Sequence, residues 1–232
     1  MRKVLAASVH VLTASGAPLG FAALLAADRG RWEAAFLWLG LALVADGLDG
    51  PLARRIDAAR VLPRFSGRDL DLIVDYLNYV TVPAFIVARS AVVPHTLAVP
   101  LAMGIMLVSL YHFADADSKT GEGYFVGFPA IWNLVALYGF VLDVPQVWMA
   151  VLIGICAVLT FVPLRWLHPF RVRRLRPATL IVVAVWSCAA VFACLQGFPG
   201  ALAVRLVFTA TALYVTALGI FGSANIRIGY MR

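Results

Sequence analysis

Two pairs of aspartates lie beside long apolar segments of this chain, where charged residues are unexpected. Asp46 and Asp49 are three residues apart, and Asp71 and Asp75 are four residues apart. On helices each pair therefore shares one face, with one turn between its members. Apolar sequence precedes the first pair and follows the second, so both pairs are predicted near the ends of membrane-embedded helices. Carboxylates at such positions are costly and mark candidate functional sites.

Four converging carboxylates would repel one another unless cations held them together. Hard divalent ions such as Mg²⁺ and Mn²⁺ prefer oxygen ligands, and a pair of such ions is suited to phosphoryl transfer. Without metals, carboxylates at the edge of a membrane would have to be largely protonated. The aspartates therefore predict a site for two divalent cations and a phosphotransfer reaction.

Long apolar segments must position these aspartates. Of the 232 residues, 62% are hydrophobic and 13% are charged, and the mean hydropathy is +0.90. This composition is typical of a membrane protein, and the length suits a single integral-membrane domain over residues 1–232. The apolar runs are unbroken rather than alternating, which favours helices over the strands of a barrel. We expect an all-α fold, a polytopic bundle of about eight transmembrane helices. The expected segments are approximately residues 10–27, 34–53, 70–88, 94–113, 126–142, 145–163, 178–196 and 200–222.

The basic residues predict the orientation of this bundle. With eight spans and a cytoplasmic N-terminus, all but four of the 19 Lys and Arg residues fall on the cytoplasmic side, as the positive-inside rule requires. Both termini and the aspartates are then expected at the cytoplasmic face. The net charge of +7 belongs to this asymmetry. It indicates attraction to anionic membrane lipids rather than nucleic-acid binding, because no recognition module accompanies it.

The sequence around the aspartates resembles the signature of the CDP-alcohol phosphatidyltransferase family. That signature is Asp-x-x-Asp-Gly-x-x-Ala-Arg, a spacer, and then Gly-x-x-x-Asp-x-x-x-Asp. Every fixed position is filled here, by Asp46, Asp49, Gly50, Ala53, Arg54, Gly67, Asp71 and Asp75. The spacer, residues 55–66, is longer than is usual in the family, as it is in the bacterial members that use choline as acceptor.

The resemblance implies a CDP-linked lipid donor and a role for each residue of the signature. The four aspartates are expected to bind two Mg²⁺ or Mn²⁺ ions, with Asp75 also acting as the general base. The expected CDP-binding residues are Gly50, Ala53, Arg54 and Gly67. For the glycines the alternative is helix–helix packing, and for Arg54 it is an ordinary arginine extending from a helix end. The family also implies a homodimer and, for the bacterial members, a location in the inner (cytoplasmic) membrane with the active site facing the cytoplasm.

Residues 111–133 mix aromatic and acidic side chains, which is a composition suited to a quaternary ammonium. Ring faces attract the cation, and a carboxylate balances its charge. The candidate choline-binding residues are Tyr111, Asp115, Asp117, Glu122, Tyr124, Phe125 and Trp132, and Tyr76 and Tyr79 are further candidates. The segment is similar to the corresponding region of the bacterial members that use choline. An aromatic belt at the membrane interface is the alternative explanation.

The most specific expectation is transfer of the phosphatidyl group from CDP-diacylglycerol to choline, with release of CMP. Serine, inositol or glycerol phosphate are alternative acceptors. Such acceptors should need a basic pocket near residues 111–125, where Lys119 is the one lysine or arginine. A divalent-cation transporter is a more distant alternative. Transport predicts acids at mid-membrane on several helices and inverted repeats, whereas the acids here cluster at one face and the two halves of the sequence do not match.

Overall fold

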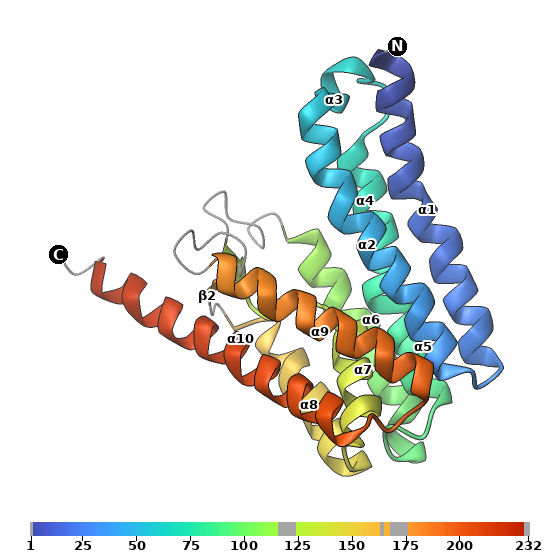
Figure 1. Cartoon of the computed structure of the whole chain (residues 1–232), viewed down its shortest axis with the longest axis vertical. Helices are drawn as coiled ribbons and strands as arrows, with labels where there is room; N and C mark the ends of the chain where they lie inside the picture. Colours follow the sequence, from blue (N-terminus) through green and yellow to red (C-terminus); the bar gives the residue numbers. More distant parts are fainter. Residues whose placement is uncertain (1, 116–123, 163–164, 168–175, 230–232) are drawn as a thin grey trace.

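The computed structural model describes residues 2–115, 124–162, 165–167 and 176–229 (Figure 1). These ranges are almost entirely helical, as the composition predicts. The exceptions are two three-residue strands, β1 (Tyr124–Val126) and β2 (Arg165–Leu167), which pair antiparallel with Phe125 opposite Trp166.

Helical segments occur at each of the eight places where apolar sequence predicts one. They are α1 (Arg2–Asp28), α2 (Trp32–Ile56), the continuous run of α4 (Gly67–Asp75), η1 (Tyr76–Thr81) and α5 (Val82–Arg89), then α6 (His95–Ala114), α7 (Trp132–Leu142), α8 (Gln146–Leu159), α9 (Arg176–Gln196) and α10 (Leu202–Gly229). A four-residue helix, α3 (Ala58–Val61), lies between the two aspartate helices.

Five of these segments are long and apolar enough to cross a membrane, namely α1, α2, the α4–α5 run, α6 and α9. Helices α7 and α8 are shorter than the approximately 20 residues that a full crossing needs, whereas α10 has 28 residues, with side chains described as far as Leu218. The expected segment 126–142 is also shorter as a helix, because Val126 belongs to β1 and α7 begins only at Trp132. Eight complete crossings therefore remain a prediction.

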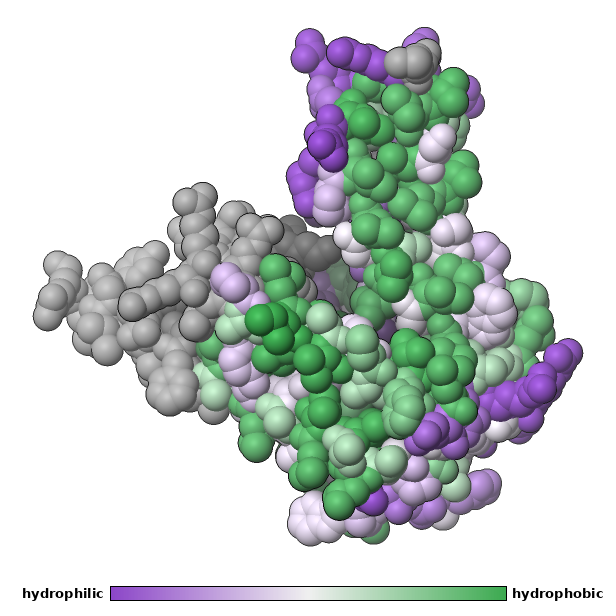
Figure 2. Space-filling view, viewed as in Figure 1, coloured by the Kyte–Doolittle hydropathy of each residue, from purple (hydrophilic) through white to green (hydrophobic). Residues whose placement is uncertain are grey.

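The helices form an upright layer and an oblique layer. Helices α1, α2 and α4 stand side by side with α3 at their upper end, while α9 and α10 run obliquely across the lower half (Figure 1). Figure 2 shows hydrophilic residues gathered near α3 and toward the turn between α1 and α2, with hydrophobic surface between these two ends. This distribution is that of a bundle embedded in a membrane.

Both aspartate helices end or begin at defined caps. Helix α2 stops after Arg54 and Arg55 because Asp57 adopts a left-handed conformation, with φ of 55°, and its backbone N–H bonds to the carbonyls of Ala53 and Arg54. Helix α4 begins at Ser66, whose Oγ accepts a 3.2 Å hydrogen bond from the Asp69 backbone N–H, as an N-cap does. The connection between the caps fixes where the two aspartate pairs face each other.

The helical run does not stop where α4 ends at Asp75, since it continues directly into a π-helical segment, η1. Such segments are rare and occur frequently at functional sites. Buried Asn78 in η1 donates a 3.1 Å hydrogen bond to the carbonyl of Gly16 on α1. A Cβ at Gly16 would overlap Val74, and one at Gly20 would overlap Asn78. The glycines of α1 therefore let the second aspartate helix lie directly against it.

Candidate functional site

Three of the four signature aspartates converge at one point between α2 and α4. One carboxylate oxygen each from Asp46, Asp49 and Asp71 lies within 4.8 Å of the others. Asp49 is buried, with 6% of its surface exposed, and the other two are half-buried. Oxygen ligands at this spacing fit a hard divalent cation, and held together without one they would repel. The residues present therefore suit the metal that the signature implies.

Asp75 lies one turn beyond Asp71, at the last position of α4. In the described part of the chain it is not a member of the three-carboxylate group. Tyr79, in the π-helical segment, links the two halves of the motif. Its hydroxyl donates a 2.7 Å hydrogen bond to Asp46 Oδ2, and it follows Asp75 by four residues in the same helical run.

Sequence reasoning considered Tyr79 as a contact for choline and missed its contact with a carboxylate. The helical spacing between Asp75 and Tyr79 predicts that they share a face. It does not predict that the π-helical turn directs the phenol across to α2. The hydrogen bond identifies Tyr79 as a residue that fixes the orientation of a predicted metal ligand, as partners of ligating carboxylates do.

The nucleotide candidates on α2 lie on the aspartate face. Gly50 is four residues after Asp46, and a Cβ built there would lie 3.3 Å from Nη1 of Arg54. The guanidinium therefore folds back over Gly50 instead of extending away from the helix, although the side chain is exposed. This arrangement places a cationic donor next to Gly50, on the face of α2 that carries Asp46. Ala53 is half-buried on the same helix.

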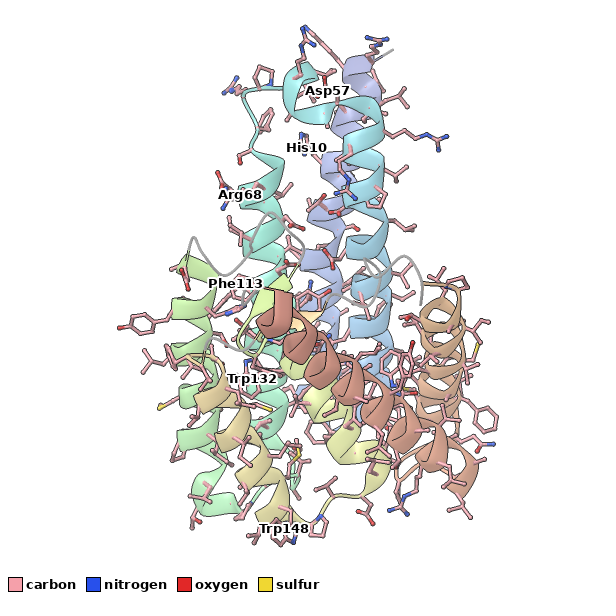
Figure 3. All side chains as sticks on the ribbon, turned by 90° about the vertical axis from the view of Figure 1, so that its left-hand side faces the viewer. His10, Asp57, Arg68, Phe113, Trp132 and Trp148 are labelled. Atoms are coloured by element: carbon pink, nitrogen blue, oxygen red, sulfur yellow. The ribbon has the colours of Figure 1, made fainter. Side chains whose placement is uncertain are left out.

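Gly67, the remaining nucleotide candidate, packs against α1. A Cβ there would lie 3.0 Å from Cε1 of His10, and Figure 3 shows His10 on the side of α1 that faces α4. Nε2 of His10 is buried and has no hydrogen-bond partner in the described part of the chain. The contact supports the packing role for Gly67. It also shows that a polar residue of α1, His10, borders the site. A histidine within an otherwise apolar helix is the feature of the sequence that could have indicated this.

Among the residues whose side chains are described, the choline candidates do not lie together as the aspartates do. Tyr111, near the end of α6, is 63% exposed, and its ring lies 6.3 Å from that of Phe161. Asp115 follows the same helix and is exposed. Tyr124 and Phe125 belong to β1, with side chains outside the described part. Asp117 and Glu122 lie outside the described residues.

Trp132 belongs to the packed interior, as Figure 3 shows. Its side chain is 1% exposed, and its indole N–H donates a 2.8 Å hydrogen bond to Ser109 Oγ. The ring also packs edge-on against Phe128, with 4.8 Å between centroids. A cation has no access to this ring in the structure. The burial of Trp132 therefore does not support the predicted contact with choline.

Comparisons with known proteins agree with the signature. The family model for CDP-alcohol phosphatidyltransferase matches residues 3–162. The phosphatidylcholine synthase of Agrobacterium fabrum is 41% identical over 217 residues, which cover 94% of this chain and 90% of that protein. The phosphatidylcholine synthase of Pseudomonas aeruginosa is 46% identical over 188 residues, 80% of this chain and 78% of that protein. A more distant relative of the same name, from Borreliella burgdorferi, is 31% identical over 185 residues, 80% of this chain and 79% of that protein. By the extent of the family match and the identity of these relatives, this chain belongs to the CDP-alcohol phosphatidyltransferase family.

Proposed function

We propose that this enzyme is a phosphatidylcholine synthase, which transfers the phosphatidyl group of CDP-diacylglycerol to choline and releases CMP. The observation that carries the proposal is the convergence of Asp46, Asp49 and Asp71 within the region that matches the family. The names of the relatives, which align with most of this chain, support choline as the acceptor.

The donor binds at the meeting point of α2 and α4. We assign the four aspartates as ligands of two divalent cations, Mg²⁺ or Mn²⁺, which when bound would neutralise the diphosphate and the oxygen that departs with CMP. Arg54 contacts a phosphate of CDP, because its guanidinium already lies over Gly50. The absence of a side chain at Gly50 lets the nucleotide approach the backbone of α2, and Ala53 continues that face.

Asp75 acts as the general base in this proposal. The choline oxygen forms a new bond to the phosphorus that carries diacylglycerol, and the bond from that phosphorus to the bridging oxygen of CMP breaks. The hydroxyl proton of choline passes to the Asp75 carboxylate. Asp75 suits this role because it lies at the end of α4, one turn past Asp71 of the three converging carboxylates.

Choline is held by residues of the 111–125 region in this proposal. Tyr111 is exposed at the end of α6 and free of the core, and Asp115 is exposed four residues later. A ring face and a carboxylate together suit a quaternary ammonium, which offers no hydrogen-bond donor of its own. Tyr124, Phe125, Asp117 and Glu122 are further candidates from the sequence.

The setting that we infer is the inner (cytoplasmic) membrane of a bacterium. The single domain of residues 1–232 crosses it eight times as a homodimer, with both termini and the active site facing the cytoplasm. The asymmetric distribution of lysine and arginine supports this orientation, and nucleotide substrates are found on that side. The dimer rests on family precedent alone.

The test is an assay with the purified chain in lipid nanodiscs, supplied with CDP-diacylglycerol and a panel of radiolabelled alcohols. We expect phosphatidylcholine and CMP to form in equal amounts, and only when a divalent cation is present. The neutral analogue 3,3-dimethylbutan-1-ol keeps the shape and hydroxyl of choline without the charge, and should be a poor substrate. Consumption of serine or inositol at the choline rate would contradict the assignment of the acceptor.

A further inference from the structure

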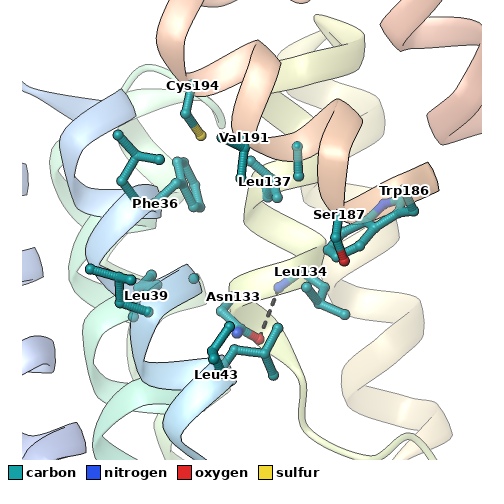
Figure 4. Close-up of a pocket in the computed structure, with 15 residues that line it drawn as sticks. Phe36, Leu39, Leu43, Asn133, Leu134, Leu137, Trp186, Ser187, Val191 and Cys194 are labelled. Carbon is teal, nitrogen blue, oxygen red and sulfur yellow. Dashed lines mark hydrogen bonds between the residues drawn. The ribbon is translucent and has the colours of Figure 1, made fainter. Parts of the chain in front are cut away.

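An apolar groove lies between α2, α7 and α9, with a volume of about 430 Å³ (Figure 4). Phe36, Leu39 and Leu137 form its buried back wall. Its rim is exposed, since 58% of Val44 and 50% of Val191 are accessible. The lining is mostly apolar and contains no charged side chain. Its polar members are Asn133 and Ser187, and it also includes Cys194 and Trp186. The groove therefore opens sideways, toward the hydrocarbon of the membrane.

The groove ends about one helical turn before Asp46, since its lining on α2 runs from Phe36 to Val44. Leu39, Leu43, Asp46 and Gly50 follow one another at intervals of three or four residues, so they share one face of α2. Leu43 lines the groove, and Asp46 follows it by about 4.5 Å along the helix axis. The opposite end at Phe36 is about 15 Å from Asp46 along the axis, which is about half the hydrocarbon thickness of a bilayer.

We infer that this groove binds an acyl chain of the phosphatidyl donor, and that α9 helps to select the donor by closing one wall. The inference rests on the proposed function, because a donor whose diphosphate lies at Asp46 must place its chains in apolar surroundings next to that residue. The groove begins one turn from Asp46 and runs away from the charged end of α2. Its length matches one leaflet.

The wall formed by α9 lies outside the part of the chain that the family model matches, which ends at residue 162. Trp186, Ala190, Val191 and Cys194 share one face of α9 and line the groove. The catalytic aspartates thus belong to the family region, whereas one side of the acyl site comes from the C-terminal helices. This wall is therefore a place where donor preference can differ without any change in the chemistry.

Filling the groove tests the inference. A Cβ at Gly40, which lines the groove, meets no atom within 4 Å, so Gly40→Leu adds a side chain where there is open space, and Ala190→Leu adds one from α9. The control is Gly154→Leu on α8, where a Cβ also meets nothing within 4 Å and which does not line this groove. We expect both groove variants to raise KM for dioleoyl CDP-diacylglycerol about tenfold, which corresponds to displacing roughly two methylenes.

The acyl chains of a dihexanoyl donor end before they reach Gly40, so the KM for this donor should rise much less. The KM for choline should stay as in the control. If both groove variants keep the chain-length profile of the control, the acyl site is elsewhere.

A second measurement uses the unmodified chain, so it does not depend on how the variants fold. CDP-diacylglycerol with a diazirine in one acyl chain should label peptides from residues 36–44 and 186–194. Unlabelled CDP-diacylglycerol should compete, and phosphatidylethanolamine should not. Equal labelling by phosphatidylethanolamine with the same diazirine chain would show a groove for any lipid and would overturn the inference.

The two proposals fail separately. If labelling is competed by CDP-diacylglycerol but choline is not turned over, the proposed function is contradicted and the acyl-chain groove is still supported. If phosphatidylcholine is made but α9 is not labelled, only the groove is contradicted.

Discussion

The proposed donor side and the proposed acceptor side of this enzyme are built in different ways. Asp46, Asp49 and Asp71 come from two long helices and converge within 4.8 Å. The acceptor candidates are divided between a helix end, a short strand and the packed interior, where Trp132 is 1% exposed. On a helix, the spacing of residues in the sequence determines which side chains share a face. The composition of a segment does not determine where its side chains lie.

The largest effect is expected at the converging aspartates. Asp49→Asn should lower turnover by 10³-fold or more, a loss of about 4 kcal/mol of transition-state stabilisation, because an amide offers a hard cation no negative charge. Asp57→Asn is the matched control, since this aspartate is exposed and its left-handed backbone suits asparagine. CMP release in nanodiscs measures both variants. Full activity of the unmodified chain in excess EDTA would remove the metal site from the mechanism.

The scaffold behind the second aspartate pair should be nearly as sensitive, but through folding. Gly20→Leu forces a side chain into Asn78, so α1 and the π-helical segment can no longer pack. We expect most of the protein to be lost from the monodisperse fraction in size-exclusion chromatography. Gly104→Leu, where a Cβ meets nothing within 4 Å, should behave normally. A folded Gly20→Leu protein with full activity would show that close packing against α1 does not position the site.

The sequence predicts the convergence of Asp46, Asp49 and Asp71 because two physical rules act there together. Membrane burial makes a carboxylate too costly to keep without a function, and helical periodicity places residues three or four apart on one face. These rules predict the aspartate helices, the all-α class and a helix at each of eight places. They do not predict the π-helical turn after Asp75, which depends on packing of Asn78 against α1.

The acceptor side could be predicted only in outline, for an equally physical reason. An aromatic residue serves a hydrophobic core as readily as a cation site, and the sequence does not distinguish these uses. Trp132 and Tyr111 have similar neighbours in the sequence, yet one is enclosed and the other is 63% exposed. The groove between α2 and α9 was not predicted, because residues 36–44 and 186–194 are far apart in the chain.

A smaller effect is expected from substitution of Tyr79. It tests whether this residue supports the predicted metal ligand Asp46 or contacts choline. Tyr79→Phe removes the 2.7 Å hydrogen bond to Asp46, and loss of such partners typically costs about 10- to 100-fold in metal affinity. The half-saturating Mn²⁺ concentration should rise by that factor, while KM for choline stays unchanged. Tyr76→Phe is the control, because that hydroxyl donates to the Met106 carbonyl instead. A selective rise in KM for choline would return Tyr79 to the acceptor side.

The smallest effect should come from Tyr111, and it is the most direct test of the acceptor side. Because the ring is 63% exposed, its attraction for choline is worth about 0.5–1 kcal/mol. Tyr111→Leu should therefore raise KM for choline about two- to fivefold, and leave KM for CDP-diacylglycerol unchanged. The variant should also discriminate less between choline and 3,3-dimethylbutan-1-ol.

Trp132→Leu provides the contrast, because it removes a buried ring and its hydrogen bond to Ser109. Truncation of a buried ring to alanine typically costs about 3–5 kcal/mol; leucine should cost less than that but still lower the unfolding temperature before the choline kinetics change. If Trp132→Leu instead folds normally and raises KM for choline more than Tyr111→Leu does, the ring must become accessible during turnover. The acceptor site would then lie within the bundle, in contact with the core between α6 and α7, rather than at its exposed end.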